Sequence, residues 1–366
     1  MLPTMHRRAL LLSLLAGPGL APSAARAGIA GPVRPRPLAF PADFGAHPDT
    51  RTEWWYVTGA LQADSRTWGF QVTFFRSSTD VAAAQPSAFA ARQLVFAHAA
   101  ITDLQQGRLQ HDQRIARAGF GIAEAGADDT RVTLRNWHLD RQALPGGSRY
   151  TTQVRSDSAG FALDLQMDTT QPLLLQGDAG YSRKGPRPAQ ASHYYSQPQL
   201  AVQGRLRRGG EAIAVTGRAW LDHEWSDSLL DAEAVGWDWI GMNLDDGAAL
   251  TAFRLRRADG SALYAGGSFR AVGQTARIFG AGEVVFTPGR MWQSPSSKAR
   301  YPVEWRVRTP SGSFTVRALL DDQELDSRSS TGSIYWEGLS DLLDDRGLHI
   351  GRGYLELTGY AASLRL

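Results

Sequence analysis

Short runs in which apolar and polar residues alternate fill most of the chain, and turns rich in glycine, serine and aspartate separate them. A period of two is typical of β-strands, because successive side chains point to opposite faces of a sheet. Strands this short and closely spaced favour an antiparallel sandwich or barrel over alternating strands and helices. We therefore predict an all-β protein, in which only residues 80–92 and 340–345 could form a helical turn or two.

Two predicted hairpins are unusually rich in tryptophan. The first joins residues 48–59 to 68–76, and the second joins 237–244 to 248–256 through the turn Asp-Asp-Gly. Their similarity indicates that each half of the chain is one barrel-like unit that begins with an aromatic hairpin. Further strands are predicted over residues 94–103, which carry His98, and over 131–139, 150–155, 160–167, 212–216, 333–338 and 351–360.

The segment from residue 219 to 256 has an unusual distribution of polar groups. Alternation places Leu221, His223 and Trp225 on one face of a strand. It places Trp220, Asp222 and Glu224 on the other, and in the next strand it separates Asp238 from Trp237 and Trp239. A strand with imidazole and indole on one face and carboxylates on the other has no ordinary apolar side. We interpret this segment as a candidate functional site; the alternative is that His223 and Trp225 are structural core residues.

The N-terminus has the pattern of a signal peptide. Arg7 and Arg8 precede an apolar run over residues 9–16, and Ala-Arg-Ala at 25–27 is a small-x-small cleavage site. The run is too short for a transmembrane helix. We predict that residues 1–27 are removed and that the protein is periplasmic or secreted. The paired arginines also permit export by the twin-arginine route.

Composition excludes several classes of function. Without residues 1–27 the chain carries equal numbers of basic and acidic residues, which does not support a nucleic-acid partner. The chain has no cysteine, so disulfides and thiolate chemistry are excluded. Residues 28–41 contain four prolines and are predicted to form an extended lead-in.

Several motifs, in order along nearly the whole mature chain, resemble the AttH/CrtC family, which includes carotenoid 1,2-hydratase. They are Glu-Trp-Trp-Tyr at 53–56, His-Tyr-Tyr-Ser-Gln-Pro at 193–198, Trp-Leu-Asp-His-Glu-Trp at 220–225, Gly-Trp-Asp-Trp-Ile-Gly at 236–241 and Gly-Tyr-Leu-Glu-Leu-Thr-Gly-Tyr at 353–360. The resemblance implies two lipocalin-like antiparallel β-barrel domains packed together, over residues 42–227 and 228–366. It also implies a pocket for a polyene, lipid or polyketide. Family members are often associated with MacB-type ABC exporters, so such a transporter is an expected partner.

The resemblance also suggests site residues. His223 and Trp225 match a catalytic His and Trp of the carotenoid hydratases, although the Tyr-x-Asp pair of that branch has no clear counterpart here. Alkene hydration needs a proton donor, a dry pocket and a positioned water, and a buried Asp222, Asp238 or Glu224 could be the donor. Indole faces could stabilise the cation. The aromatic residues expected to contact ligand are Trp55, Tyr56, Tyr194, Tyr195, Trp237 and Trp239.

No motif for a cofactor or metal is present in the sequence. It has no second histidine to complete a zinc-protease helix after residue 223, no Gly-x-Ser-x-Gly elbow and no phosphate-binding loop between a strand and a helix. We predict an exported protein that binds a hydrophobic small molecule, with hydratase-like or cyclase-like activity, and no cofactor or metal. The alternatives are a non-catalytic carrier or chaperone that works with an exporter, and a structural module without a pocket.

Overall fold

A computed structural model describes residues 33–79, 81, 85, 87, 89–228 and 230–364. The predicted signal peptide over residues 1–27, and residues 28–32 of the lead-in, lie outside this part of the chain. Within it, the single helical element is the 3-10 turn η1 (Ala42–Phe44). No helix among the described residues is long and apolar enough to cross a membrane.

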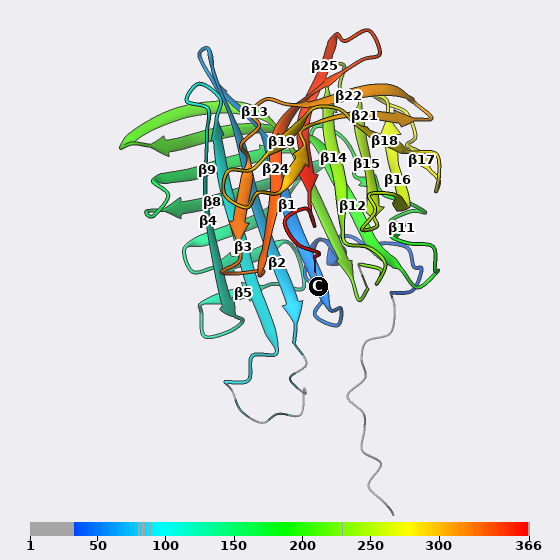
Figure 1. Ribbon diagram of the computed structural model, residues 1–366. Helices are drawn as coiled ribbons and strands as arrows, with labels where there is room; N and C mark the ends of the chain where they lie inside the picture. The colour runs from blue at the N-terminus through cyan, green and yellow to red at the C-terminus, as the bar shows by residue number, and fades with distance from the viewer. Residues whose placement is uncertain are drawn as a thin grey trace, which may run out of the picture.

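The first half of the chain forms one antiparallel sheet (Figure 1). Its strand order is β4-β3-β2-β1-β13-β12-β9-β8-β7-β6-β5, and β10 and β11 pair with β12. The long strands β1, β12 and β13 lie at its centre, where the aromatic motifs are located. The strands are β1 (Thr52–Ala63), β2 (Arg66–Ser78), β3 (Gln93–Asp103), β4 (Arg108–Arg117), β5 (Ala123–Ala125), β6 (Arg131–Leu134), β7 (Trp137–Leu144), β8 (Gly147–Ser156), β9 (Phe161–Asp168), β10 (Leu174–Leu175), β11 (Tyr181–Arg183), β12 (Ala191–Arg208) and β13 (Glu211–Ser226).

The second half forms another antiparallel sheet, with the order β17-β16-β15-β14-β25-β24-β22-β21-β18. Strand β23 pairs with β24, and β19 and β20 form a separate pair. The strands are β14 (Gly236–Leu244), β15 (Ala249–Arg256), β16 (Ala262–Arg270), β17 (Arg277–Phe279), β18 (Val285–Pro288), β19 (Met291–Gln293), β20 (Arg300–Pro302), β21 (Glu304–Thr309), β22 (Gly312–Ala318), β23 (Glu324–Ser327), β24 (Ser333–Leu343) and β25 (His349–Leu357). The predicted division after residue 227 falls between the last strand of the first sheet and the first strand of the second.

The prediction of an all-β, antiparallel fold is confirmed. Both tryptophan-rich hairpins are present, as β1–β2 and β14–β15. Of the two segments that could have formed a helical turn, residues 340–345 do not, because residues up to Leu343 continue β24 and pair with β25; residues 80, 82–84, 86 and 88 of the other segment lie outside the described residues. Leu339 and Leu342 on that strand are both fully buried, on opposite sides of the sheet. Because both faces of the strand are buried here, apolar and polar residues do not alternate in the sequence, and alternation is the pattern by which a strand is predicted.

Each sheet curls around its own hydrophobic core, and the two sheets also pack against each other (Figure 1). Strand β1 contacts β25, β13 contacts β14, and β2 contacts β24. A third cluster of buried side chains lies between the sheets and includes Tyr56, Trp220, Trp239, Leu339 and Tyr354. The strands at this contact therefore have one face in their own core and the other face toward the neighbouring sheet.

Candidate functional site

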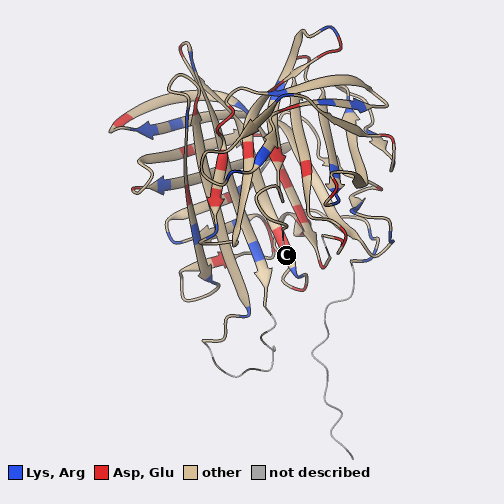
Figure 2. Ribbon diagram, in the orientation of Figure 1, with Lys and Arg blue, Asp and Glu red and all other residues tan. Residues whose placement is uncertain are grey.

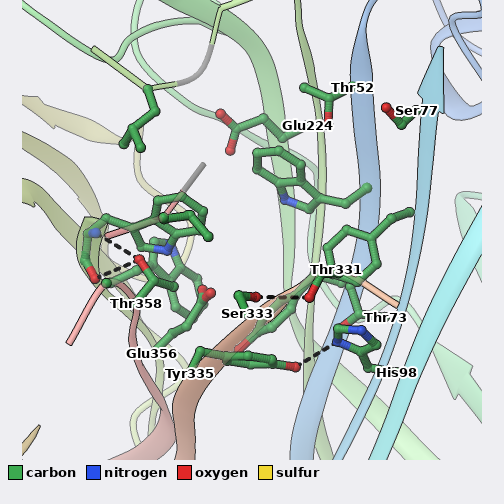
Figure 3. A pocket seen from close by; sticks show the side chains of 18 of the residues that line it. Thr52, Thr73, Ser77, His98, Glu224, Thr331, Ser333, Tyr335, Glu356 and Thr358 are labelled. Atoms are coloured by element: carbon green, nitrogen blue, oxygen red, sulfur yellow. Dashed lines mark hydrogen bonds between the residues drawn. The ribbon is translucent and has the colours of Figure 1, made fainter. Parts of the chain in front are cut away.

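A cavity of about 710 Å³ lies between the two sheets (Figure 3). Its walls come from β1, β2, β3, β12 and β13 of the first sheet and from β14, β15, β24 and β25 of the second. Both aromatic and acidic side chains line it. Acidic positions recur on the strands in the middle of the molecule, where the sheets meet (Figure 2). The aromatic walls include Trp54, Tyr56, Phe75, Tyr194, Trp237 and Trp239.

Asp222 faces this cavity from β13 and accepts three hydrogen bonds. Tyr194 Oη donates to its Oδ2 at 2.6 Å, and Ser196 Oγ and Trp220 Nε1 donate to its Oδ1, each at 2.6 Å. Burial raises the pKa of Asp222 to about 7, although these donors oppose the shift. All three hydrogen bonds are donated to Asp222, so they stabilise its carboxylate form, whereas burial and the nearby Glu224 favour the protonated form. Trp239 Nε1 donates in turn to Tyr194 Oη at 3.2 Å.

Glu224 lies two residues further along β13, lines the same cavity and forms a salt bridge with a second lining residue. Its Oε1 lies 3.0 Å from Lys184 Nζ. The same ammonium lies 4.5 Å from the ring centroid of Tyr194 and 4.4 Å from that of Phe253. Lys184 is only 7% exposed, so the carboxylate and the two ring faces compensate the cost of burying its charge.

His98 lines the cavity from β3, opposite the second sheet. Its Nδ1 is 2.9 Å from Tyr335 Oη (Figure 3). Its Nε2 is 2.8 Å from Ser330 Oγ, so His98 joins the two halves of the chain. Burial lowers the pKa of His98 to about 3, which keeps the imidazole neutral. Sequence reasoning noted His98 within a predicted strand but did not include it in the site. No local motif marks it, because its partners are more than 230 residues away.

His223 and Trp225 do not line the cavity. They project from the opposite face of β13 into the core of the first sheet, where the His223 ring stacks on Trp55 at a centroid distance of 4.6 Å. Tyr195 lies on the same side, with its hydroxyl 3.0 Å from His223 Nδ1. The alternation predicted for this strand is therefore confirmed, and the side with the carboxylates is the one that faces the cavity.

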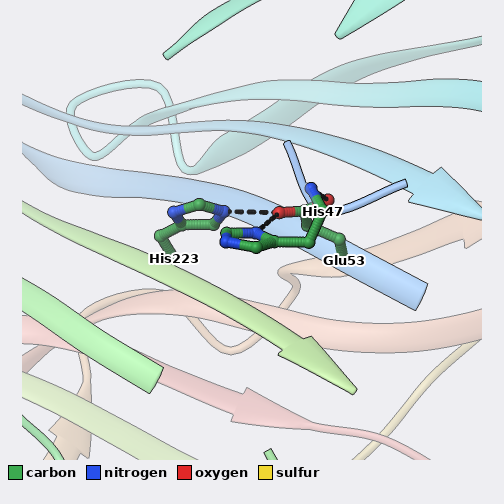
Figure 4. Close-up of side chains that lie close together, drawn as sticks. All are labelled: His47, Glu53 and His223. Carbon is green, nitrogen blue, oxygen red and sulfur yellow. Dashed lines mark hydrogen bonds and ion pairs between the residues drawn. The ribbon is translucent and has the colours of Figure 1, made fainter. Parts of the chain in front are cut away.

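Glu53 is the centre of a buried charge network around His223 (Figure 4). Its Oε1 lies 2.8 Å from His223 Nε2 and 2.7 Å from His47 Nδ1, and its Oε2 accepts a hydrogen bond from Arg76 Nε at 2.8 Å. The other ring nitrogen of His47 lies 2.9 Å from Asp43 Oδ1. An imidazole between two carboxylates satisfies both only when both nitrogens carry protons.

The direction of the pKa shift of His47 agrees with a ring that carries protons on both nitrogens. Although burial opposes the shift, hydrogen bonds to Asp43 and Glu53 raise the pKa of His47. Burial lowers the pKa of His223 to about 4, so we assign it as a neutral imidazole that donates to Glu53 and accepts from Tyr195. Against the effect of burial, bonds from His223 and His47 hold the pKa of Glu53 well below its usual range.

The same three residues have a spacing that could hold a metal ion. One donor atom each of His47, Glu53 and His223 lies within 4.8 Å of the others. These atoms already bond to one another, and the Arg76 guanidinium occupies the second carboxylate oxygen. We therefore interpret the cluster as an ion-paired network that links β1, β2 and β13 to the segment before β1.

Asp238 also lies away from the cavity. It is fully buried in the second sheet, where Arg254 Nε donates to Oδ2 at 2.6 Å and Tyr360 Oη donates to Oδ1 at 2.8 Å. Of the residues predicted from sequence, the structure brings Asp222, Tyr56, Tyr194, Trp237 and Trp239 together around the cavity. It places His223, Trp225, Asp238, Trp55 and Tyr195 in the two cores. Whether any of them acts in catalysis stays a prediction.

Comparison with known proteins places the fold. A family model described as AttH-like matches residues 31–360. A solved structure from Nitrosomonas europaea, assigned to AttH, is 48% identical, has a TM-score of 0.83, and the match covers 90% of this chain and 99% of that one. Kievitone hydratase from Nectria haematococca is 15% identical with a TM-score of 0.65, over 91% and 98% of the two chains.

A third similar structure is CghA with Sch210972, at 13% identity and a TM-score of 0.51, over 85% of this chain and 89% of that one. At such identities the likeness to CghA and to kievitone hydratase shows the fold alone. No curated protein matches. The family model and the 48%-identical structure both extend over nearly the whole described chain. The chain therefore belongs to the AttH-like family.

Proposed function

We propose that this protein binds a hydrophobic small molecule in the cavity between its two sheets and adds water to it in a hydratase-type reaction. The observation that carries the proposal is the cavity itself, which combines aromatic walls with buried carboxyl groups. Its volume of about 710 Å³ is in the range of small-molecule sites, which are mostly apolar with a few placed polar groups.

The polar groups of the cavity suit proton transfer to an apolar ligand. Hydration of an alkene needs an acid that stays protonated near neutral pH, and buried carboxyls supply such acids. It also needs stabilisation of a developing cation, which the indole faces of Trp237 and Trp239 could give. The name of kievitone hydratase, whose fold is shared, supports the reaction type.

Obstructing the cavity should abolish binding. Ser77 lines it from β2 and is half-buried, so Ser77→Trp should place an indole in the space that a ligand needs. We expect the affinity for N-phenyl-1-naphthylamine, a neutral hydrophobic fluorophore, to fall by a factor of about 10 or more, since displaced apolar burial is worth about 25 cal/mol per Å². Fluorescence titration measures the dissociation constant.

Ser313→Trp is the matched control, because Ser313 is a half-buried strand serine on β22 that does not line the cavity. Its affinity for the fluorophore should stay at the wild-type value. Equal binding by wild type and Ser77→Trp would contradict a ligand site in this cavity. Incubation with kievitone, followed by mass spectrometry for the gain of one water, then separates a hydratase from a carrier.

We further propose that the protein is exported. The proposal is supported by the charged start, the apolar run and the Ala-Arg-Ala site at residues 25–27. Expression of the full chain in a bacterium should yield a periplasmic or secreted protein that begins at Gly28, which intact-mass measurement detects as the loss of residues 1–27. A protein that is recovered from the cytoplasm with Met1 would contradict export.

A further inference from the structure

Two glutamates of the second sheet are neighbours on adjacent strands in one wall of the cavity. Glu337 on β24 and Glu356 on β25 are directly paired in the antiparallel register. Both line the cavity, as Figure 3 shows for Glu356. Side chains opposite each other on one face of an antiparallel pair have Cβ atoms about 4.5–5.5 Å apart, and like charges there repel. Two ionised carboxylates are therefore unfavourable at this position.

Nothing in the described part of the chain neutralises this pair. Glu337 is 2% exposed and its Oε1 has no hydrogen-bond partner there. No ion pair joins Glu337 or Glu356 to a basic side chain among the residues that the structure describes; the nearby ammonium of Lys184 is paired with Glu224. The Tyr56 hydroxyl lines the same cavity and lies close enough to Glu337 to lower the pKa of that carboxyl, although the two form no hydrogen bond of regular geometry.

None of the titratable groups that face the pair carries a positive charge. Besides Tyr56 on β1 they are Asp222 and Glu224 on β13, Tyr335 on β24 and Tyr354 on β25, together with the neutral His98 beyond Tyr335. Burial raises the pKa of Glu356 to about 7, and burial and the proximity of Glu356 raise the pKa of Glu337 well above its usual value. Two buried negative charges without a cation are unfavourable, so the state in which the pair retains a proton is favoured.

We propose that Glu337 and Glu356 share one proton and are the acid–base pair of the cavity. This inference rests on the proposed function and names the two residues that would carry its proton transfer. The protonated carboxyl gives its proton to one alkene carbon, and the π electrons form the new C–H bond. Water then forms the C–O bond at the neighbouring carbon and loses a proton to the carboxylate of the pair, which returns to its starting state.

The protonation of the pair can be measured without knowing the substrate. The full-length chain is labelled with carbon-13 at the glutamate side-chain carboxyl, and NMR spectra are followed over pH for the wild type, Glu337→Gln and Glu356→Gln. We expect one proton to remain on the pair at pH 7, and each single variant to shift the titration of the remaining carboxyl to lower pH, because its like-charged neighbour is gone. Glu124→Gln, an exposed position on β5, is the matched control and should leave both signals unchanged.

Two ionised carboxyls at pH 7, or a Glu356 signal that titrates identically with and without Glu337, would overturn the inference. Activity gives a second measurement. Glu337→Gln and Glu356→Gln should each slow the hydration of kievitone by about 100-fold or more, while binding of N-phenyl-1-naphthylamine stays within about threefold of wild type. If the wild type does not bind the fluorophore, the proposed function fails; if it binds and the two carboxyls are ionised, only the shared proton fails.

Discussion

Replacing Glu53 by glutamine should lower the free energy of unfolding by about 3–5 kcal/mol, because it removes the carboxylate that the buried cations Arg76 and His47 share. Arg76 is 2% exposed and donates to Glu53 Oε2 at 2.8 Å, and the His47 ring donates to Oε1. Glutamine keeps the volume but not the charge. Its amide nitrogen would also face either the Arg76 guanidinium or a protonated imidazole, so one contact becomes repulsive.

Urea unfolding followed by tryptophan fluorescence measures this loss. Glu304→Gln is the matched control, since Glu304 also accepts from an arginine, Arg317, at 2.8 Å, but in a half-exposed pair on the second sheet. Exposed pairs contribute about 0–1 kcal/mol, so the control should change stability little. Equal, small effects of the two substitutions would show that the network around Glu53 does not hold the first barrel together.

The second large effect is expected from acid and depends on His98. Its pKa in the folded protein, about 3, lies below the usual 6.5, so the folded state favours the neutral ring. The stabilisation that this ring contributes is fully present above pH 6.5 and is lost as the pH falls toward 3, because the unfolded chain binds the proton first. Between pH 7.5 and 4 the loss from this residue alone is about 3 kcal/mol.

A variant isolates this contribution from the other titrating groups. At pH 7.5 His98→Gln should be less stable than wild type, by about 1–3 kcal/mol, because Tyr335 and Ser330 lose bonds to the ring. At pH 4 the difference should shrink by about 3 kcal/mol and can change sign. The control His138→Gln, at a partly exposed side chain, should stay within about 0.5 kcal/mol at both pH values. A His98→Gln difference that is constant over pH would contradict a buried neutral histidine.

The sequence was sufficient to predict the fold class, the two aromatic hairpins and the two faces of the strand that carries Asp222. These features depend on local alternation, which one chain displays directly. The sequence could not predict which face lines the cavity. The choice between His223 and Asp222 depends on how one sheet packs on the other, and both faces of β13 are buried.

The sequence could not predict the pair of Glu337 and Glu356 for a related reason. Glu337 and Glu356 each look like an ordinary strand glutamate in sequence, and only the register of β24 with β25 places them opposite each other. The same holds for Glu53 and His223, which are 170 residues apart. Such contacts between distant positions are set by topology, whereas the motif around Asp222 is contained within six consecutive residues.

A cavity whose walls belong to two sheets makes its occupant a part of the contact between them. A molecule that fills the cavity would touch β1 and β13 on one side and β24 and β25 on the other, so it would favour only the state in which both halves are folded and docked. At a concentration of 100 times its dissociation constant, such a ligand would add about 2.7 kcal/mol to that docked state. The chain without ligand is then expected to melt in two separate steps, one for each sheet, and the chain with ligand in one step. Calorimetry would detect the ligand as an increase in the cooperativity of unfolding.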